Sequence, residues 1–144
     1  MTCRFHLAIP VKDIDEAKLF YCNFLGCEEG NSEEGWVDIN FWGNELTLHK
    51  AQEDELKMTH RHHVDMAAVC VPHFGIHLLR EDFDEIKKRI QSSDEFDFLD
   101  QPFLRFKDGY REQETFFIRD PSGNAIEIKT MKTPESLWDT TNKN

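Results

Sequence analysis

The sequence predicts an α+β fold built from two β-α-β-β-β modules, whose sheets pair around a shared axis into a curved, mixed sheet that encloses a cavity. Two observations support this fold class. Strand-like and helix-like patterns follow one another in the same order in both halves of the chain. Short motifs of the first half also return, in order, in the second half, which indicates duplication of one supersecondary unit. We expect a single domain over residues 1–144.

The first module is expected over residues 1–50. Asp13 can cap a helix, Gly26 can end it, and "GN" (43–44) predicts a tight hairpin turn. Before that turn, apolar and polar residues alternate as they do in a half-buried strand. The expected elements are a strand over 4–11, a helix over 13–26, a strand over 36–42 and a returning strand over 45–50.

The second module is expected over residues 72–131, after a polar and aperiodic connector over 51–71. The pattern of elements restarts there, and an insertion between Asp94 and Arg111 makes this copy longer than the first. Residues 132–144 have the composition of a polar tail. The expected elements are a strand over 72–78, a helix over 81–93, and strands over 114–120 and 125–130.

The repeat assigns equivalent positions to the two modules. "FHLAIPV" aligns with "PHFGIHL", and "GNELTLHK" aligns with "GNAIEIKT" without a gap. In this register three pairs of residues are equivalent: His6 with His73, Ala8 with Gly75, and Thr47 with Glu127.

Charge and composition exclude several classes of partner. The chain of 144 residues carries a formal net charge of −11 at pH 7, whereas binding to nucleic acid or to an anionic membrane needs surplus Lys and Arg. No apolar run approaches the length of about 20 residues that a membrane-spanning helix needs. The four cysteines form no Cys-x-x-Cys pair, and the N-terminus lacks the pattern of a leader. We therefore expect a reducing, cytoplasmic location.

Two histidines and one glutamate form the candidate metal site. When equivalent modules pair around an axis, equivalent residues converge on the middle, and His6 and His73 are such residues. Glu127 lies on the last strand of the second module, where Ile126 and Ile128 face away from it. Two imidazoles and one carboxylate with open coordination positions suit Fe(II) or Mn(II), with Zn(II), Co(II) or Ni(II) as alternatives.

The chain resembles the vicinal oxygen chelate superfamily of glyoxalases, bleomycin-resistance proteins and extradiol dioxygenases. "FHLAIPVKDIDEAKLFYCNFLG" (5–26) is similar to the opening strand and helix of that family. "DPSGNAIEIK" (120–129) is similar to its closing motif, in which an Asp-Pro-x-Gly turn leads to a carboxylate ligand. The resemblance covers nearly the whole chain. It implies the glyoxalase fold, and it implies that His6, His73 and Glu127 bind a divalent metal ion.

The sequence leaves open whether a fourth ligand exists. Glyoxalase I members of the superfamily add a glutamate on the last strand of the first module, where the repeat register places Thr47. An alternative register makes Glu45 that ligand, and strand alternation does not decide, because Glu45, Thr47 and His49 share one face. The gap-free alignment favours Thr47, and hence three protein ligands.

A three-ligand site resembles the dioxygenase branch of the superfamily more than glyoxalase I. The substrate can bind through two adjacent oxygens and still leave a position for O2, so Fe(II) is the favoured metal. A nearby acid-base residue would move protons, and His49 and His77 lie on the ligand-bearing faces by strand alternation. Gly75, between His73 and His77, would leave room for the chelated substrate.

Other interpretations of the same residues stay open. One is a glyoxalase I-like lyase or isomerase that acts on a thiol adduct of a 2-oxoaldehyde, with Glu45 bound to the metal. Another is a non-catalytic, bleomycin-resistance-like protein that binds a small molecule. The resemblance also implies a homodimer, with modules that pair within one chain or between two. "HRHH" (60–63) is interpreted as a solvated connector rather than as a second metal site or a flap over the cavity.

Overall fold

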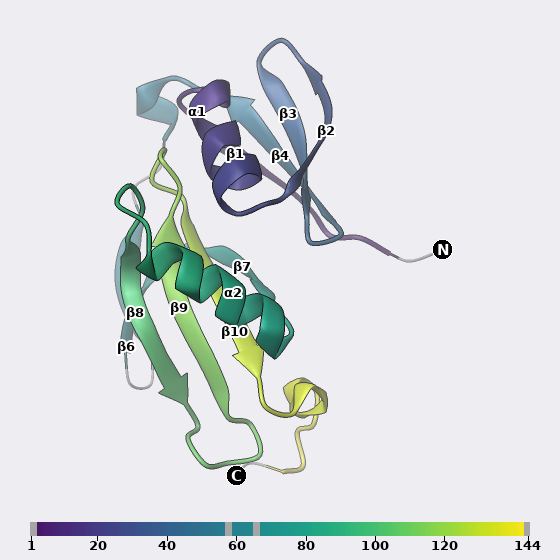
Figure 1. The fold of residues 1–144 in the computed structure, drawn as a ribbon, viewed down its shortest axis with the longest axis vertical. Coiled ribbons are helices and arrows are strands. Elements are labelled where there is room, and N and C mark those ends of the chain that lie inside the picture. The colour runs from purple at the N-terminus through teal and green to yellow at the C-terminus, as the bar shows by residue number, and fades with distance from the viewer. Residues whose placement is uncertain (1–2, 57–58, 65–66, 143–144) are drawn as a thin grey trace. The chain divides into compact units, whose positions relative to one another are not determined.

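The computed structural model describes residues 3–56, 59–64 and 67–142. Each of its two compact units contains a four-stranded mixed sheet with a helix (Figure 1). The structure thus confirms the α+β class and the two β-α-β-β-β modules, while their pairing into one sheet stays a prediction. Unit 1 is Met1–Thr59 with Asp120–Asn124, and unit 2 is His60–Arg119 with Ala125–Asn144.

Unit 1 begins with the predicted strand and helix. Asp13 caps the helix as predicted, because its side chain accepts a hydrogen bond of 2.8 Å from the N–H of Glu16. After Lys18 the helix widens into a π-helical segment, whose wider turn lets the N–H of Leu25 reach the carbonyl oxygen of Phe20. The elements are β1 (His6–Val11), α1 (Ile14–Lys18), the π-helical segment (Leu19–Phe24), β2 (Glu28–Glu33), β3 (Trp36–Phe41), β4 (Asn44–Lys50) and a short 3-10 helix (Glu53–Glu55), with sheet order β1-β4-β3-β2.

Unit 2 repeats this arrangement after a hairpin. Its helix carries Glu81 and Asp82 in the first turn and Lys88 and Arg89 in the last turn, which suits the helix dipole. The last strand pairs in parallel with the first strand of the module and antiparallel with the third, as in unit 1. The elements are β5 (His60–Val64), β6 (Ala67–Val71), β7 (Phe74–His77), α2 (Arg80–Gln91), β8 (Phe98–Arg105), β9 (Gln113–Arg119), β10 (Ala125–Met131) and a 3-10 helix (Pro134–Leu137), with sheet order β7-β10-β9-β8.

Strand register confirms the repeat register that the sequence predicted. Thr47 pairs with Ala8 in unit 1, and Glu127 pairs with Gly75 in unit 2. Glu45 lies two residues before Thr47, so the equivalent position in unit 2 carries no carboxylate. The equivalence of Thr47 with Glu127 is therefore a property of the two sheets and not only of the alignment.

Four segments differ from the sequence prediction. Neither β2 nor β8 was expected, because every residue of β2 is exposed and β8 lies in the predicted insertion. The predicted connector 51–71 contains the antiparallel hairpin of β5 and β6. The tight turn of unit 1 is Trp42–Gly43 rather than Gly43–Asn44, because Asn44 already pairs with Phe41. Trp42 and Gly43 both have positive φ, as a type I′ turn requires.

The core of each unit lies on one face of its sheet, where the helix packs. Because side chains alternate along a strand, the residues between the core positions point to the other face, which we call the open face. The core positions include Val37, Ile39, Leu46 and Leu48 with Phe20 in unit 1, and Phe116, Ile126 and Ile128 with Phe83 in unit 2. The open face carries His6, Asp38, Glu45, Thr47 and His49 in unit 1, and Gly75, His77, Thr115, Phe117 and Glu127 in unit 2.

The turn between β9 and β10 is anchored by a buried tyrosine of unit 1. The hydroxyl of Tyr21 donates a hydrogen bond of 2.8 Å to Asp120, and Tyr21 is fully buried. The side-chain amide of Asn124 donates to Asp120 and to the carbonyl oxygen of Pro10. Burial raises the pKa of Asp120 although these donors oppose the change. The Asp-Pro-Ser-Gly-Asn motif thus fixes the chain just before β10, the strand that carries Glu127.

Replacing Tyr21 by Phe is expected to lower the free energy of unfolding by about 1–3 kcal/mol, because a buried carboxylate loses a donor. Urea denaturation followed by circular dichroism measures this change. Tyr110→Phe is the matched control, because its hydroxyl bonds Asp139 at a partly exposed site and its loss should cost less than about 0.5 kcal/mol. Equal losses in both variants would contradict the anchoring role.

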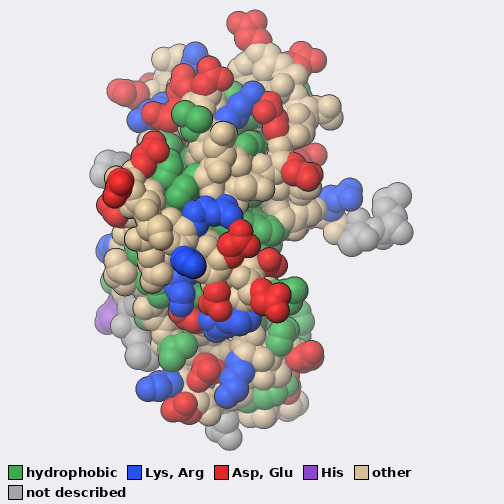
Figure 2. Space-filling view, viewed as in Figure 1, with side chains coloured by type: hydrophobic (Ala, Val, Ile, Leu, Met, Phe, Trp, Pro, Cys, Tyr) green, Lys and Arg blue, Asp and Glu red, His purple; other side chains and the backbone are tan. Residues whose placement is uncertain are grey.

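Acidic and basic side chains are interspersed on the face shown in Figure 2. Lys and Arg gather around α2 but alternate there with Asp and Glu, so no broad basic surface for phosphates forms on this face. Among the described residues, the helices are too short or too polar to cross a membrane.

Candidate metal centre

His6 opens β1 in unit 1, and its register partner on β4 is Glu45. Its Nδ1 atom lies 2.5 Å from Oε1 of Glu45, and the two side chains are 57% and 52% exposed. When Nδ1–H donates to the carboxylate, the neutral imidazole keeps the lone pair of Nε2 for another partner. Glu45 therefore orients the imidazole of His6.

Thr47 occupies the position in unit 1 that Glu127 occupies in unit 2. It is 6% exposed, and its hydroxyl donates a hydrogen bond of 2.6 Å to Oδ1 of Asp38 on β3. Because this buried hydroxyl is already committed to a carboxylate, Thr47 is a poor metal ligand. His6 is the one predicted metal ligand in unit 1.

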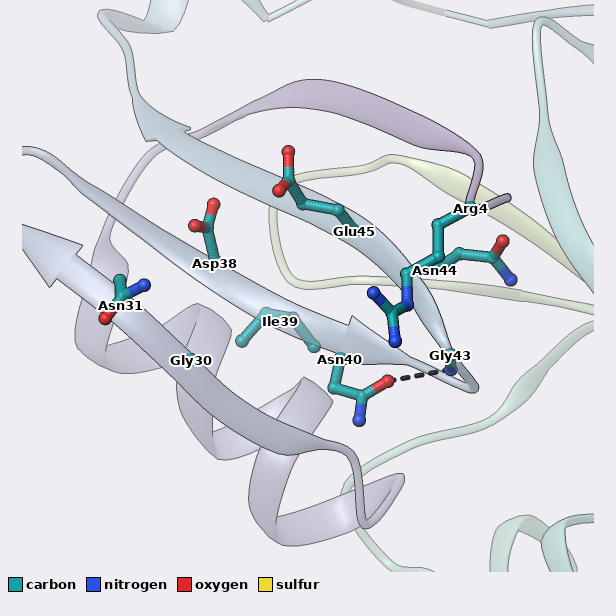
Figure 3. A pocket seen from close by; sticks show the side chains of 9 residues that line it. All are labelled: Arg4, Gly30, Asn31, Asp38, Ile39, Asn40, Gly43, Asn44 and Glu45. Atoms are coloured by element: carbon teal, nitrogen blue, oxygen red, sulfur yellow. Dashed lines mark hydrogen bonds between the residues drawn. The ribbon is translucent and has the colours of Figure 1, made fainter. Parts of the chain in front are cut away.

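A pocket of about 270 Å³ lies on unit 1 beside Glu45 (Figure 3). Figure 3 shows the carboxylates of Asp38 and Glu45 projecting to the same side of the sheet. The backbone of Gly30 on β2 comes close to Asp38, and the turn at Gly43 closes one end. The polar side chains that line this pocket belong to Arg4, Asn31, Asp38, Asn40, Asn44 and Glu45.

In unit 2 the structure brings His73 and Glu127 together. Nε2 of His73 lies 3.2 Å from Oε2 of Glu127, and Nδ1 of His73 lies 2.5 Å from the carbonyl oxygen of Cys70. The other carboxylate oxygen, Oε1, accepts a hydrogen bond of 2.7 Å from the hydroxyl of Thr115. The ring of Phe117 packs edge-on against the imidazole, with 5.0 Å between centroids. Three neighbours thus hold the two side chains in place.

Electrostatics keep Glu127 ionised although it is only 7% exposed. Burial alone would raise its pKa, but the hydrogen bond from His73, the charge of Lys129 at 3.4 Å and the bond from Thr115 lower it to about 2. The hydrogen bond to Glu127 is also the main cause that raises the pKa of His73, against the effect of burial. Unit 2 therefore holds a buried anionic oxygen next to an imidazole nitrogen.

This donor set fits a divalent cation. His6 and His73 each have Nδ1 at a protein acceptor, which is the arrangement that orients metal-binding histidines and leaves Nε2 for the ion. Two ligand atoms that each lie about 2.1 Å from one ion are about 3.2 Å apart at an angle of about 100°. The Nε2–Oε2 distance of 3.2 Å between His73 and Glu127 agrees with such a shared ion.

The structure places His6 in unit 1 and the other two predicted ligands in unit 2. Within the described ranges, no group of three or more His, Cys, Asp or Glu side chains is arranged to hold a metal ion. The pair of His73 and Glu127 is thus an observation, and the addition of His6 to it stays a prediction.

The two candidate acid-base histidines lie on the open faces, as strand alternation predicted. His77 ends β7 opposite Lys129, and partial burial and the charge of Lys129 lower its pKa. At neutral pH its imidazole is therefore uncharged and able to accept a proton. His49 is exposed on β4, opposite Trp36.

Gly75 lies beside Glu127, but the reason for a glycine differs from the one expected. A Cβ atom at this position would lie 1.8 Å from the carbonyl oxygen of Glu127. Glycine is therefore needed because the backbones of β7 and β10 approach closely here. Room for a substrate is not required to explain it.

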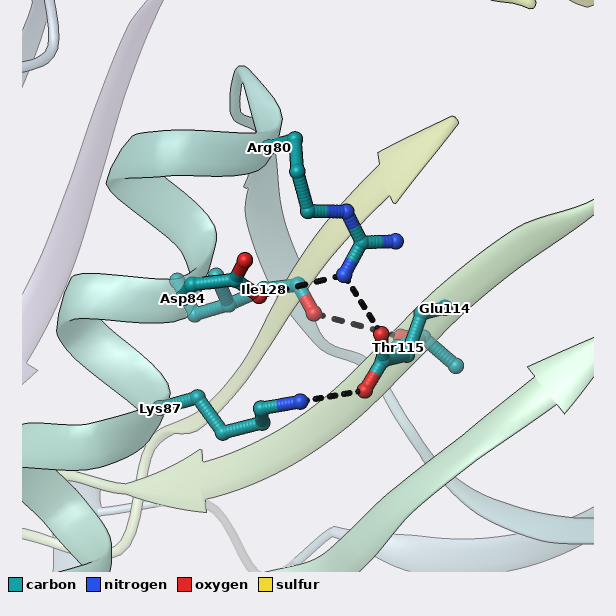
Figure 4. A network of polar contacts seen from close by, with 6 residues as sticks. All are labelled: Arg80, Asp84, Lys87, Glu114, Thr115 and Ile128. Atoms are coloured by element: carbon teal, nitrogen blue, oxygen red, sulfur yellow. Dashed lines mark hydrogen bonds and ion pairs between the residues drawn. The ribbon is translucent and has the colours of Figure 1, made fainter. Parts of the chain in front are cut away.

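Glu114, the neighbour of Thr115 on β9, points to the opposite face (Figure 4). Its carboxylate contacts Arg80 at 2.6 Å and Lys87 at 2.8 Å, and both residues lie on α2. Against the effect of burial, these two cations lower the pKa of Glu114. The network connects α2 to β9, so one face of β9 is tied to the helix while the other holds Glu127.

The β5–β6 hairpin packs on β8 and β9 of unit 2. Arg61 of β5 contacts Asp100 at 2.8 Å, and Arg119 contacts the sulfur of Cys70 at 3.5 Å. The register of β8 with β9 puts Asp100 opposite Phe117, and Arg119 follows Phe117 on the same face. Residues 60–63 therefore form a strand rather than an irregular connector, although their side chains are exposed as predicted, and the hairpin covers part of the open face that carries Glu127.

In metal-free protein, the pair of His73 and Glu127 is expected to stabilise the fold most between pH 4.5 and 6.5, the ordinary pKa values of its two groups. The lowered pKa of Glu127 contributes stability above pH 4.5 that is lost as the pH falls towards 2. The raised pKa of His73 contributes stability below pH 6.5 that is lost as the pH rises through the raised value. Urea denaturation in the presence of a chelator should show Glu127→Gln to be less stable than wild type by about 1–3 kcal/mol at pH 5.5. A difference that does not shrink on either side of this window would contradict the assignment.

A family model described as the glyoxalase/bleomycin resistance protein/dioxygenase superfamily matches residues 5–128, which span both modules. The chain belongs to this superfamily. None of the curated proteins matches the chain.

Solved structures of the superfamily share the fold across nearly the whole chain. A glyoxalase/bleomycin resistance protein/dioxygenase from Alicyclobacillus acidocaldarius is 31% identical, with a TM-score of 0.76, over 94% of this chain and 96% of that one. The fosfomycin resistance protein FosX from Listeria monocytogenes is 18% identical, with a TM-score of 0.68, over 94% and 97% of the two chains. The oxidase ChaP-H2 is 17% identical, with a TM-score of 0.62, over 92% and 96%. The last two similarities show the fold alone.

Proposed function

We propose that this protein is a metal-dependent dioxygenase in which His6, His73 and Glu127 bind one divalent ion. One observation carries the proposal: both histidines give Nδ1 to a protein acceptor, so that Nε2 remains for a metal, and Nε2 of His73 lies beside the buried carboxylate of Glu127. Membership of a superfamily that contains dioxygenases supports it.

Fe(II) is the proposed metal, with Mn(II), Zn(II), Ni(II) or Co(II) as alternatives. Two imidazoles and one carboxylate are the ligand set of non-haem Fe(II) oxygenases, and a metal so bound supplies Lewis acidity with positions open for two adjacent substrate oxygens and for O2. The chain's own residues keep the ligands in place. Thr115 fixes Glu127, the Cys70 carbonyl fixes His73, and Phe117 packs against the imidazole.

His77 is the proposed acid-base residue, because its lowered pKa keeps it neutral and able to take a proton from the substrate. His49, on the open face of unit 1, is the second candidate for this role. If a His77→Gln variant keeps both its metal and full turnover, His77 has no role in the mechanism.

Elemental analysis of anaerobically purified protein, followed by oxygen-uptake measurements, tests the proposal. We expect one metal ion per chain, and oxygen uptake with an enediol or catechol substrate only after loading with Fe(II). A protein that binds no divalent metal, or that turns over a chelating substrate without consuming O2, would overturn it.

A glyoxalase I-like lyase is the second candidate, because Glu45 lies next to His6, where it can serve as a fourth ligand. This candidate predicts turnover of a thiol adduct of a 2-oxoaldehyde without O2, with Ni(II), Co(II) or Zn(II).

A non-catalytic binder is a third candidate, and it would give a folded protein that holds a small molecule without turnover. The hydrogen bonds at Nδ1 of His6 and His73 leave Nε2 for a metal, whereas the contact of His73 Nε2 with Glu127 is also what a metal-free binder would show.

Glu45→Gln and Glu45→Ala separate the two roles of Glu45. If Glu45 orients His6, Gln keeps a hydrogen-bond acceptor for Nδ1, so metal affinity should fall less than tenfold, whereas Ala should lower it about 10–100-fold. If Glu45 is a direct ligand, both variants should lose affinity alike. Competition with a chromophoric chelator measures the affinity, and Glu33→Gln, an exposed change on β2, is the control.

The same proposal includes a small-molecule substrate and a homodimer. Sedimentation equilibrium measures the oligomeric state directly. None of the four cysteines, all of which the structure describes, forms a disulfide bond. This agrees with a reducing, cytoplasmic location, which fractionation of the source cells would test.

A further inference from the structure

The pocket on unit 1 lies beside His6, the proposed metal ligand of that unit. Glu45 connects the two, since one of its oxygens contacts His6 and its side chain also lines the pocket. A molecule bound to a metal at His6 would therefore lie next to Glu45, which also lines this pocket. The side chains that line the pocket would then contact the part of the substrate that does not bind the metal. Their chemistry therefore indicates which groups that part carries.

The pocket offers hydrogen-bond acceptors of full negative charge. Oδ1 of Asp38 accepts from Thr47, and Oε1 of Glu45 contacts Nδ1 of His6. Within the described part of the chain, the second oxygen of each carboxylate has no protein donor. Two such oxygens on one side of the sheet favour a ligand that presents O–H or N–H groups to both.

The pocket also offers donors. The guanidinium of Arg4 forms no ion pair with any described residue, and Figure 3 shows it extending toward Asn40. Oδ1 of Asn40 accepts from the N–H of Gly43, which leaves the amide NH2 of Asn40 as a donor. Hydroxyls satisfy both kinds of group at once, because each hydroxyl donates and accepts.

An aromatic ring fits this pocket poorly. None of the residues that line it is aromatic, and the one large apolar residue among them, Ile39, is 1% exposed and belongs to the core. A phenyl ring placed here would desolvate Asp38 and Glu45 without giving them a partner, which is unfavourable. A volume of about 270 Å³ also suits a compact molecule.

We infer that the substrate is a small, aliphatic, hydroxyl-rich α-hydroxyketone, or the enediol of one, whose free hydroxyls bind Asp38 and Glu45. This inference rests on the proposed function, because the α-hydroxyketone oxygens are the pair that would chelate the metal. Among the substrates that could chelate the metal, this inference favours sugar-like compounds over catechols.

A matched pair of probes tests the inference. L-erythrulose and 2-hydroxyacetophenone share the α-hydroxyketone, but one carries a hydroxylated chain where the other carries a phenyl ring. Isothermal titration of anaerobic, Mn(II)-loaded protein should show that L-erythrulose binds about tenfold more tightly. Asp38→Asn keeps an acceptor for Thr47 but loses the charge, so it should weaken L-erythrulose about tenfold and leave 2-hydroxyacetophenone unchanged. Glu33→Gln, on the same sheet but outside the pocket, should alter neither.

Equal or tighter binding of 2-hydroxyacetophenone would overturn the inference, and so would unchanged affinity for L-erythrulose in folded Asp38→Asn. Metal content, measured in the same samples, reports separately on His6, His73 and Glu127. If the protein holds no Mn(II), the proposed function fails, and the ratio of the two probes and its dependence on Asp38 are then judged on the metal-free protein.

Discussion

His73→Ala is expected to lower the affinity for a divalent metal by about three orders of magnitude or more, so that the purified protein contains almost none. The substitution removes the one imidazole nitrogen that lies beside the carboxylate of Glu127. The two proposed ligands that remain, His6 and Glu127, are too small a ligand set to retain an ion against a chelator. Elemental analysis after dialysis measures the loss.

His62→Ala is the matched control, because it removes an exposed imidazole from the β5–β6 hairpin. It should leave metal content unchanged. Circular dichroism must show that His73→Ala is folded, since truncation leaves a cavity against Phe117. A folded His73→Ala protein that keeps its metal, or a His62→Ala protein that loses it, would contradict the assignment of His73.

The repeat could be predicted from the sequence because its evidence is local. Each module shows a strand, an amphipathic helix and an alternating strand, and the backbone follows those patterns. The register followed from aligning two turns, and the pairing of Thr47 with Ala8 and of Glu127 with Gly75 confirms it. A pattern that occurs twice in one chain is less easily produced by chance than either copy alone.

The strands that were missed lack a local pattern. β2 consists of polar residues and glycine and lies at the edge of its sheet, so backbone hydrogen bonds to β3 hold it and no apolar face reveals it. β5 carries "HRHH", whose side chains are exposed, and it forms a strand because β6 pairs with it. Contacts with other strands decide whether such segments become strands. These contacts cannot be deduced from a single sequence.

The sequence predicted the candidate metal ligands of the site, but not the neighbours that hold them in place. His73 and Glu127 could be placed together because the strand register brings their strands side by side. Their neighbours could not, because the Cys70 carbonyl is a backbone group with no sequence pattern and Thr115 resembles any strand threonine. Asp38 was missed for a similar reason, since its partner Thr47 was considered only as a replacement for a ligand.

Gly75→Ala is expected to be the most destabilising single substitution in unit 2, with a loss of about 3 kcal/mol or more in the free energy of unfolding. The new Cβ would lie 1.8 Å from the carbonyl oxygen of Glu127 and 2.7 Å from its carbonyl carbon. Both atoms are backbone, so no side-chain rotation relieves the contact, and β7 must move away from β10. Because this movement also separates His73 from Glu127, metal affinity should fall with stability. Urea denaturation and metal titration of the same samples measure both effects.

Gly30→Ala provides the comparison, because it makes the same chemical change in β2, where the new Cβ would meet Asp38 Cβ at 3.3 Å. A small shift of the edge strand relieves that contact, so a change within about 1 kcal/mol is expected. The equivalent of Gly75 in unit 1 is Ala8, so the repeat itself tolerates a Cβ at this position. The requirement for glycine therefore arises from the close approach of β7 to the strand that carries the carboxylate. If Gly75→Ala unfolded at the same urea concentration as Gly30→Ala, that approach would not be a feature of the folded protein, and the placement of Glu127 beside His73 would lose its backbone support.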